Sequence, residues 1–104
     1  MNYIYVLTLI ERLISKDNWT AEDNDIVKEH FNNLVKLKKE GKLLLAGKTA
    51  GQDKDTMGIV IFKATSFEEA NVLMINDPAI KKGIMTGKLW EYDIALLNSE
   101  YKND

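Results

Sequence analysis

The sequence predicts an α+β domain in which strand, helix, strand, strand, helix and strand follow one another. Short runs of β-branched and aromatic residues predict the strands, and apolar residues three and four positions apart predict the helices. With 104 residues, the chain has the length of one domain. This order is the split β-α-β arrangement of ferredoxin-like folds, in which both helices pack on one face of a four-stranded antiparallel sheet.

The first half of the chain contains a strand and a long helix. Residues 3–9 (YIYVLTL) are typical of a buried strand, and residues 10–19 predict a mixed loop with room for a turn of helix. Thr20 is suited to cap a helix, and the acidic residues after it suit the positive end of the helix dipole. The helix is expected to end near Glu40, before Gly41. Its apolar face is expected to carry Ile26, Val27, His30, Phe31, Leu34 and Leu37.

The second half begins with two strands, expected at residues 42–46 and 57–63 and joined by a polar loop. Ser66 then caps a helix at residues 67–75, in the capping-box pattern Ser66-x-x-Glu69. This helix is expected to bury Phe67, Ala70, Leu73 and Met74.

Asp77 stands directly before the only proline, Pro78. This pair predicts a short helical turn with aspartate as N-cap and proline at the first helical position. A last strand is expected at residues 88–97. We therefore expect a single domain over residues 1–98 and a polar tail over residues 99–104.

Three of the predicted strand segments are apolar on both alternating faces, namely YIYVLTL at 3–9, LLLA at 43–46 and GIVIF at 58–62. A sheet with one face in water alternates apolar and polar residues instead. The helices cover only one face, so the second face needs another cover. The simplest cover is the same face of a second copy, in a two-fold homodimer.

Composition excludes several function classes. The net charge is −2 and charges of both signs are interspersed, so the chain lacks the positive surface that binds nucleic acid. No apolar run approaches the ~20 residues of a membrane helix, and we expect no membrane partner. The absence of cysteine rules out disulfides, thiolate chemistry and Cys/His zinc sites, and it fits a cytoplasmic protein. We expect no cofactor and no metal, although a site of one histidine with carboxylates stays open.

His30, the only histidine, lies on the apolar side of the predicted helix, because Ile26 and Leu34 stand four residues either side of it. One interpretation is a core histidine whose ring nitrogens bond to backbone or carboxylate partners. The other is a general acid or base that lines a pocket between helix and sheet, since imidazole gains and loses a proton near neutral pH.

Two further residues are candidates for a site. Asp77 needs no role beyond capping a helix. If it also accepts a hydrogen bond from one ring nitrogen of His30, it sets the tautomer, leaves the other nitrogen basic and stabilises the imidazolium. Arg12, just past the first strand, would neutralise an anionic substrate, or it is a solvated loop residue. His30 and Asp77 are thus the candidate catalytic pair, and Arg12 the candidate substrate-binding residue.

Several short motifs follow one another along the chain: Tyr5-Val6-Leu7, His30-Phe31-x-x-Leu34, Glu40-Gly41-Lys42-Leu43-Leu44-Leu45-Ala46-Gly47, Gly58-Ile59-Val60-Ile61-Phe62, Ser66-x-x-Glu69-Ala70 and Asn76-Asp77-Pro78-Ala79 with Gly83. In order and spacing they resemble the YciI-like (YCII-related) family of the dimeric α/β-barrel superfamily, from Tyr3 to about Leu97. Lys48 stands where many members have proline, and Val27 where many have arginine.

The resemblance implies a ferredoxin-like fold that pairs sheet to sheet as a dimer, with a site at His30 and Asp77. It also implies cofactor-independent acid/base chemistry on small organic molecules. Our leading hypothesis is therefore a small homodimeric enzyme of the isomerase, lyase or hydrolase type, which acts on a small substrate. The alternative is a non-catalytic dimeric module that binds a small ligand or regulates a partner.

Overall fold

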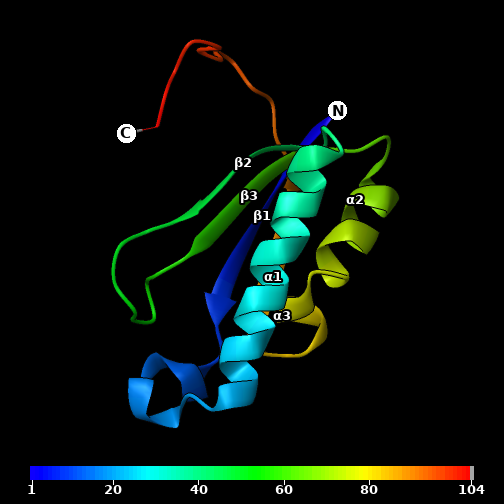
Figure 1. Ribbon diagram of the computed structural model, residues 1–104. Helices are drawn as coiled ribbons and strands as arrows, with labels where there is room; N and C mark the ends of the chain where they lie inside the picture. Colours follow the sequence, from blue (N-terminus) through cyan, green and yellow to red (C-terminus); the bar gives the residue numbers. More distant parts are fainter. Residues whose placement is uncertain (104) are drawn as a thin grey trace.

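The computed structural model describes residues 1–103 and confirms the predicted α+β fold (Figure 1). Residue 104, the last of the predicted polar tail, lies outside the described residues. The elements are, in order, β1 (Asn2–Leu9), η1 (Glu11–Ile14), η2 (Lys16–Asn18), α1 (Ala21–Lys39), β2 (Leu43–Lys48), β3 (Gly58–Lys63), α2 (Phe67–Ile75), α3 (Pro78–Lys81) and β4 (Met85–Glu91).

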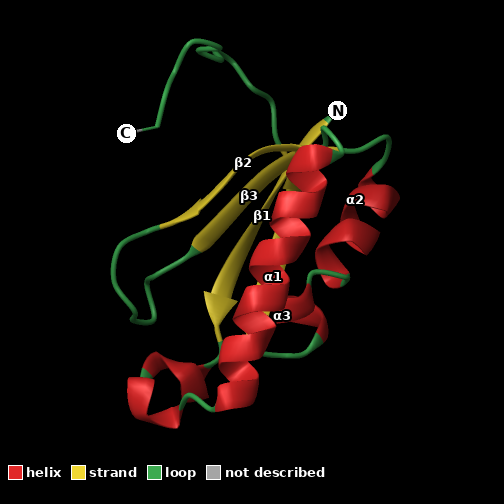
Figure 2. Cartoon of the chain, in the orientation of Figure 1, coloured by secondary structure: helices red, strands yellow, loops and turns green. Residues whose placement is uncertain are grey.

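The four strands form one antiparallel sheet in the order β2-β3-β1-β4. The helices α1, α2 and α3 lie on one face of this sheet, as the element order predicts (Figure 2). α3 packs against α1, and α2 packs against β4. This packing brings the beginning of α3 beside the middle of α1, although the two segments lie far apart in the sequence.

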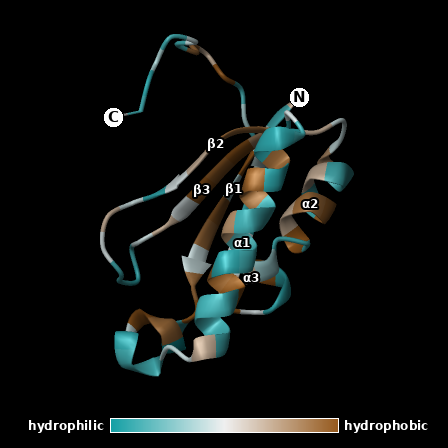
Figure 3. Ribbon diagram, in the orientation of Figure 1, coloured by the Kyte–Doolittle hydropathy of each residue, from teal (hydrophilic) through white to brown (hydrophobic). Residues whose placement is uncertain are grey.

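The core lies between the sheet and the helices. Alternate residues of β1, namely Tyr3, Tyr5 and Leu7, point into it with at most 2% exposure. Leu34 and Leu37 of α1 are buried in the same core. Hydrophobic and hydrophilic bands alternate along α1 (Figure 3), as expected of a helix with one face in the core. β1 therefore contributes three side chains to the core, all on the sheet face that the helices cover.

Two residues predicted to be buried are exposed. Phe31 is 62% exposed because a cavity, rather than packed core, lies beneath this part of α1. Phe67 is 47% exposed at the first position of α2, where its ring meets Tyr3 edge-on at 6.3 Å between centroids. Helical spacing predicts which face of a helix is turned toward the core, but it does not predict how much of that face a neighbouring element covers.

The last strand was predicted at residues 88–97, and this prediction is wrong. β4 runs instead from Met85 to Glu91, paired with β1 from Leu9 back to Tyr3. β1 begins at Asn2, whose carbonyl accepts a last hydrogen bond from the backbone N–H of Tyr92. The later residues have no strand left to pair with, so the chain leaves the sheet there despite its strand-like composition (Figure 1).

The helix caps also differ in detail from the prediction. At α1 the Thr20 hydroxyl accepts from the backbone N–H of Asp23, and the Asp23 carboxylate accepts from that of Thr20, which completes a capping box. At α2 only half of the predicted box forms. The Ser66 hydroxyl accepts from the N–H of Glu69, but the Glu69 carboxylate accepts from the hydroxyl of Thr65.

The sheet face away from the helices carries an apolar row that crosses all four strands. Leu45, Ile61, Ile4 and Trp90 are cross-strand neighbours in this row. Leu45 and Trp90, on the two edge strands, are each 49% exposed. We call these four residues the outer row.

Candidate functional site

Three elements bring their side chains together beneath α1. His30 comes from the middle of α1, Tyr5 from the inward face of β1, and Asp77 from the N-cap of α3. Asp77 takes its place because Pro78 favours the first helical position and the aspartate accepts from the freed N–H of Ala79.

The Asp77 carboxylate accepts three hydrogen bonds and has no exposed surface. Its Oδ1 lies 2.7 Å from Nδ1 of His30 and 3.0 Å from the backbone nitrogen of Ala79. Its Oδ2 accepts from the Tyr5 hydroxyl at 2.6 Å. The structure thus brings His30 and Asp77 together as the sequence analysis expected, and it adds Tyr5.

Tyr5 is a dependable donor in this arrangement. Burial raises its pKa far above the ordinary value of 10.0, and the charge and hydrogen bond of Asp77 raise it further. The phenol therefore keeps its proton at neutral pH and donates it to Asp77. Its hydrogen bond holds Oδ2, so Oδ1 stays turned toward His30.

The hydrogen bond to Asp77 also determines which nitrogen of His30 carries hydrogen. A carboxylate only accepts, so Nδ1 is the donor, and the neutral ring has its lone pair on Nε2. No atom of residues 1–103 hydrogen-bonds to Nε2, and the His30 side chain keeps 15% exposure. One nitrogen is therefore held, and the other is available to a ligand.

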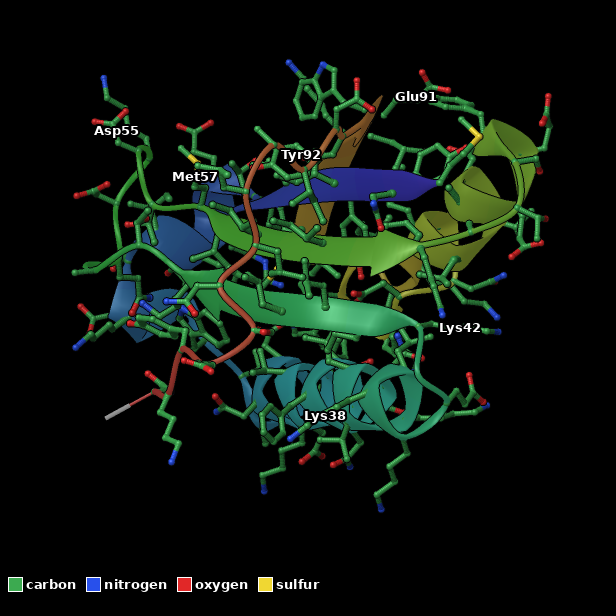
Figure 4. The ribbon with its side chains drawn as sticks, turned by 90° about the horizontal axis from the view of Figure 1, so that it is seen from above. Lys38, Lys42, Asp55, Met57, Glu91 and Tyr92 are labelled. Carbon is green, nitrogen blue, oxygen red and sulfur yellow. The ribbon has the colours of Figure 1, made fainter. Side chains whose placement is uncertain are left out.

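His30 lines a cavity of about 400 Å³ between α1 and the sheet. The cavity lies toward the β2–β3 loop, which contains Asp55 and Met57 at the end of the sheet away from Lys42 and Glu91 (Figure 4). Its walls are mostly apolar: Leu7, Leu9, Trp19, Val27, Phe31, Leu34, Ala46, Ile59, Val60 and Met85, with Gln52 and Thr56 from the loop. His30 and Lys48 are its only ionisable lining residues, and none of its lining residues is acidic.

Arg12 is not among the residues that line this cavity. Its guanidinium binds both carboxylate oxygens of Asp23 at 2.9 Å, and it also donates to the carbonyl of Asn18. The position of Arg12 therefore does not support the predicted role in substrate binding. The residue instead ties the loop after β1 to the beginning of α1.

This ion pair predicts a dependence of stability on pH. The Arg12 hydrogen bonds, followed by the Thr20 backbone N–H, hold the pKa of Asp23 well below its usual 3.8. A lowered pKa means that the stabilisation is complete above about pH 4 and is lost as the pH falls further. Asp23→Asn should therefore lower the melting temperature at pH 7, and its difference from wild type should shrink below pH 4.

Melting curves of both proteins between pH 2 and pH 7 measure this effect. Asp25→Asn is the matched control, because Asp25 lies in the same turn of α1 but is exposed. A difference between wild type and Asp23→Asn that stays constant over this range would contradict the prediction.

Sequence reasoning missed two residues of the site. Tyr5 was placed only in a predicted buried strand, yet a buried phenol needs a hydrogen-bond partner, and that requirement, which Tyr3 shares, was the available signal. Lys48 was noted only as a departure from the family pattern. Within residues 1–103, no cluster of three or more His, Cys, Asp or Glu residues could hold a metal ion, and no helix is both long and apolar enough to cross a membrane.

Comparison with known proteins agrees with this architecture. The profile of the YCII-related domain matches residues 4–91. The chain is also similar to the solved structure of 5-chloro-2-hydroxyhydroquinone dehydrochlorinase (TftG) from Burkholderia phenoliruptrix AC1100, in complex with 2,5-dihydroxybenzoquinone. The TM-score is 0.67 at 22% identity, covering 89% of this chain and 94% of that chain, and such a likeness shows a shared fold. No curated protein matches the sequence.

Proposed function

The chain belongs to the YCII-related domain family, and from the site it carries we propose that it is an acid/base enzyme acting on a small molecule. One observation carries the proposal. His30 lines a cavity while its Nδ1 is bound to a buried carboxylate and its Nε2 has no hydrogen-bond partner in residues 1–103, which is the arrangement a general base needs.

The proposed chemistry is one proton transfer in each direction. Nε2 of His30 takes a proton from the bound molecule, and the resulting imidazolium is stabilised by Asp77 through Nδ1–H. Tyr5 keeps the carboxylate in place during the step. The imidazolium then returns its proton to another atom of the molecule, or to a leaving group. Isomerisation and elimination fit this sequence, and hydrolysis fits it when Nε2 takes the proton from a water molecule that attacks the bound molecule.

Elimination is the first of these reactions to test. TftG, which shares the fold, is by name a dehydrochlorinase, and the loss of HCl from a carbon framework begins with the removal of a proton by a base. The mostly apolar lining of the cavity suits a substrate with an apolar carbon framework.

The test is a screen for proton transfer in D2O. Small carboxylic and aromatic compounds are incubated with the protein, and NMR follows deuterium incorporation and product formation. The proposal expects at least one compound to exchange or react with wild type and not with His30→Gln. A protein that binds such compounds without exchanging or converting any would instead be the non-catalytic binding module.

We further propose that the protein acts as a homodimer through the outer row. Leu45 and Trp90, at the two ends of this row, are half-exposed apolar side chains on one sheet face, which is typical of a surface that contacts another protein. Ile61, which lies between them, is already buried within the chain. In a two-fold dimer the same face of each copy contacts the other, so the outer row of one copy would pack against the outer row of its partner.

Leu45→Lys should therefore convert a dimer into a monomer. Light scattering at micromolar concentration should give twice the mass of one chain for wild type and the mass of one chain for the variant. Val72→Lys is the control, because Val72 is similarly exposed, at 54%, but lies on α2 on the helix side. A wild-type protein with the mass of one chain would contradict the dimer, and so would a dimeric Leu45→Lys variant.

A further inference from the structure

Lys48 occupies an unusual place for a surface lysine. It is the last residue of β2, paired with Gly58 of β3, which is paired in turn with Leu7 of β1. Leu7 points into the core, and cross-strand neighbours share a face, so Lys48 points to the helix side of the sheet. There it lines the cavity that His30 lines from α1.

The charge of Lys48 is not neutralised by a carboxylate. Its Nζ donates to the carbonyls of Thr49 and Gly51, at 3.1 and 3.2 Å. Within residues 1–103 it forms no ion pair, and none of the residues that line the cavity is acidic. An ammonium group has three N–H donors, so one of them remains for a ligand.

The surroundings of Lys48 narrow the ligand class. One fixed cation matches one negative charge, whereas a phosphate dianion is usually held by arginine forks or several backbone N–H groups. The rest of the cavity is lined largely by Leu, Val, Ile, Met, Phe and Trp side chains, which favour an apolar body. Arg12, the other cation considered for this purpose, is held by Asp23.

We propose that Lys48 is an anion-binding residue at the mouth of the cavity and that the ligand is a small monocarboxylate with an apolar body. The carboxylate lies at Lys48, and the body extends along the cavity toward Nε2 of His30. The identification of this ligand as a substrate rests on the proposed function, but its binding does not.

Matched pairs of probes test the proposal: benzoate with benzamide, and hexanoate with hexanamide. Each pair has the same body with and without the charge. NMR titration of wild type should show a preference of about tenfold for the carboxylate in at least one pair, the effect expected of one charged hydrogen bond. The preference should decrease as salt is added, because the contact is partly exposed.

Lys48→Met should remove this preference, and Lys48→Arg should restore most of it. Lys54→Met is the matched control, because Lys54 belongs to the loop that follows Lys48, is exposed and does not line the cavity. Amide spectra of each variant report whether the loop keeps its structure. If wild type has no preference in either pair, or if Lys48→Met keeps the preference, the proposal is wrong.

A purely structural role for Lys48 gives a different result. Lys48→Met would then weaken carboxylate and amide equally, with the ratio between them unchanged, and this outcome also overturns the proposal. His30→Gln separates the two proposals, because it should abolish proton transfer and leave the preference for carboxylates. In wild type, proton transfer without a preference for carboxylates would mean that the Lys48 proposal has failed, and a preference without proton transfer would mean that the proposed function has failed.

Discussion

His30→Gln is expected to reduce proton-transfer turnover by about 10²–10⁴-fold, the usual contribution of a general acid or base. The amide keeps hydrogen-bonding capacity and similar bulk, but it cannot exchange a proton near neutral pH. Its N–H group can still donate to Asp77, so the fold should remain intact and the melting temperature should change little.

Paired measurements separate chemistry from packing. Turnover and thermal unfolding are compared for wild type, His30→Gln and Asn32→Gln, a control at an exposed position of the same helix. If His30 were only a core residue, its replacement would lower the melting temperature and leave turnover unchanged. A destabilised His30→Gln variant with full activity would therefore overturn the catalytic role of His30.

Asp77→Asn is expected to damage both activity and stability. The carboxylate accepts from His30, Tyr5 and Ala79, and it has no contact with water that could replace these bonds. An amide has a single acceptor oxygen, and its NH2 group would face one of the donors. The unsatisfied donor should lower the free energy of unfolding by about 1–3 kcal/mol. Loss of control over the histidine tautomer should lower turnover by up to about 10⁴-fold.

Urea unfolding and turnover measure these two effects, and Tyr5→Phe provides the comparison. That variant removes one donor and keeps the carboxylate, so its loss of turnover should be smaller than that of Asp77→Asn. The double variant should lose less than the two single losses together, because both residues act through one hydrogen-bonded group. An Asp77→Asn protein with wild-type turnover would show that another contact orients His30.

Much of the fold could be predicted from local patterns. The alternation in β1 and the spacing in α1 predict those elements to within one or two residues. The strand- and helix-type segments in order predict the antiparallel sheet with its helices on one face. His30 and Asp77 were candidates for local reasons: one stands between apolar residues four positions away, and the other stands before the only proline.

Such local patterns could not predict which residues of different elements would contact one another. Tyr5 and Asp77 are 72 residues apart, and only the packing of α3 beneath α1 brings the phenol to the carboxylate. The end of β4 depends on where β1 begins, which no pattern within residues 88–97 records. Arg12 and Lys48 differ in the same way. Both are basic residues at or just beyond the end of a strand. Their roles differ because a carboxylate from another element binds Arg12, whereas Lys48 binds only backbone carbonyls.

The sequence by itself therefore determined the order of the elements and the pair of residues around which the candidate site is built. Only the tertiary structure decided that Tyr5 supports Asp77, that the cavity reaches His30, and that Lys48 rather than Arg12 lines it. The physical reason is the separation along the chain over which each kind of interaction acts. Backbone preferences and apolar periodicity act between residues a few positions apart, whereas the partners of a buried polar group come from whichever elements pack against it.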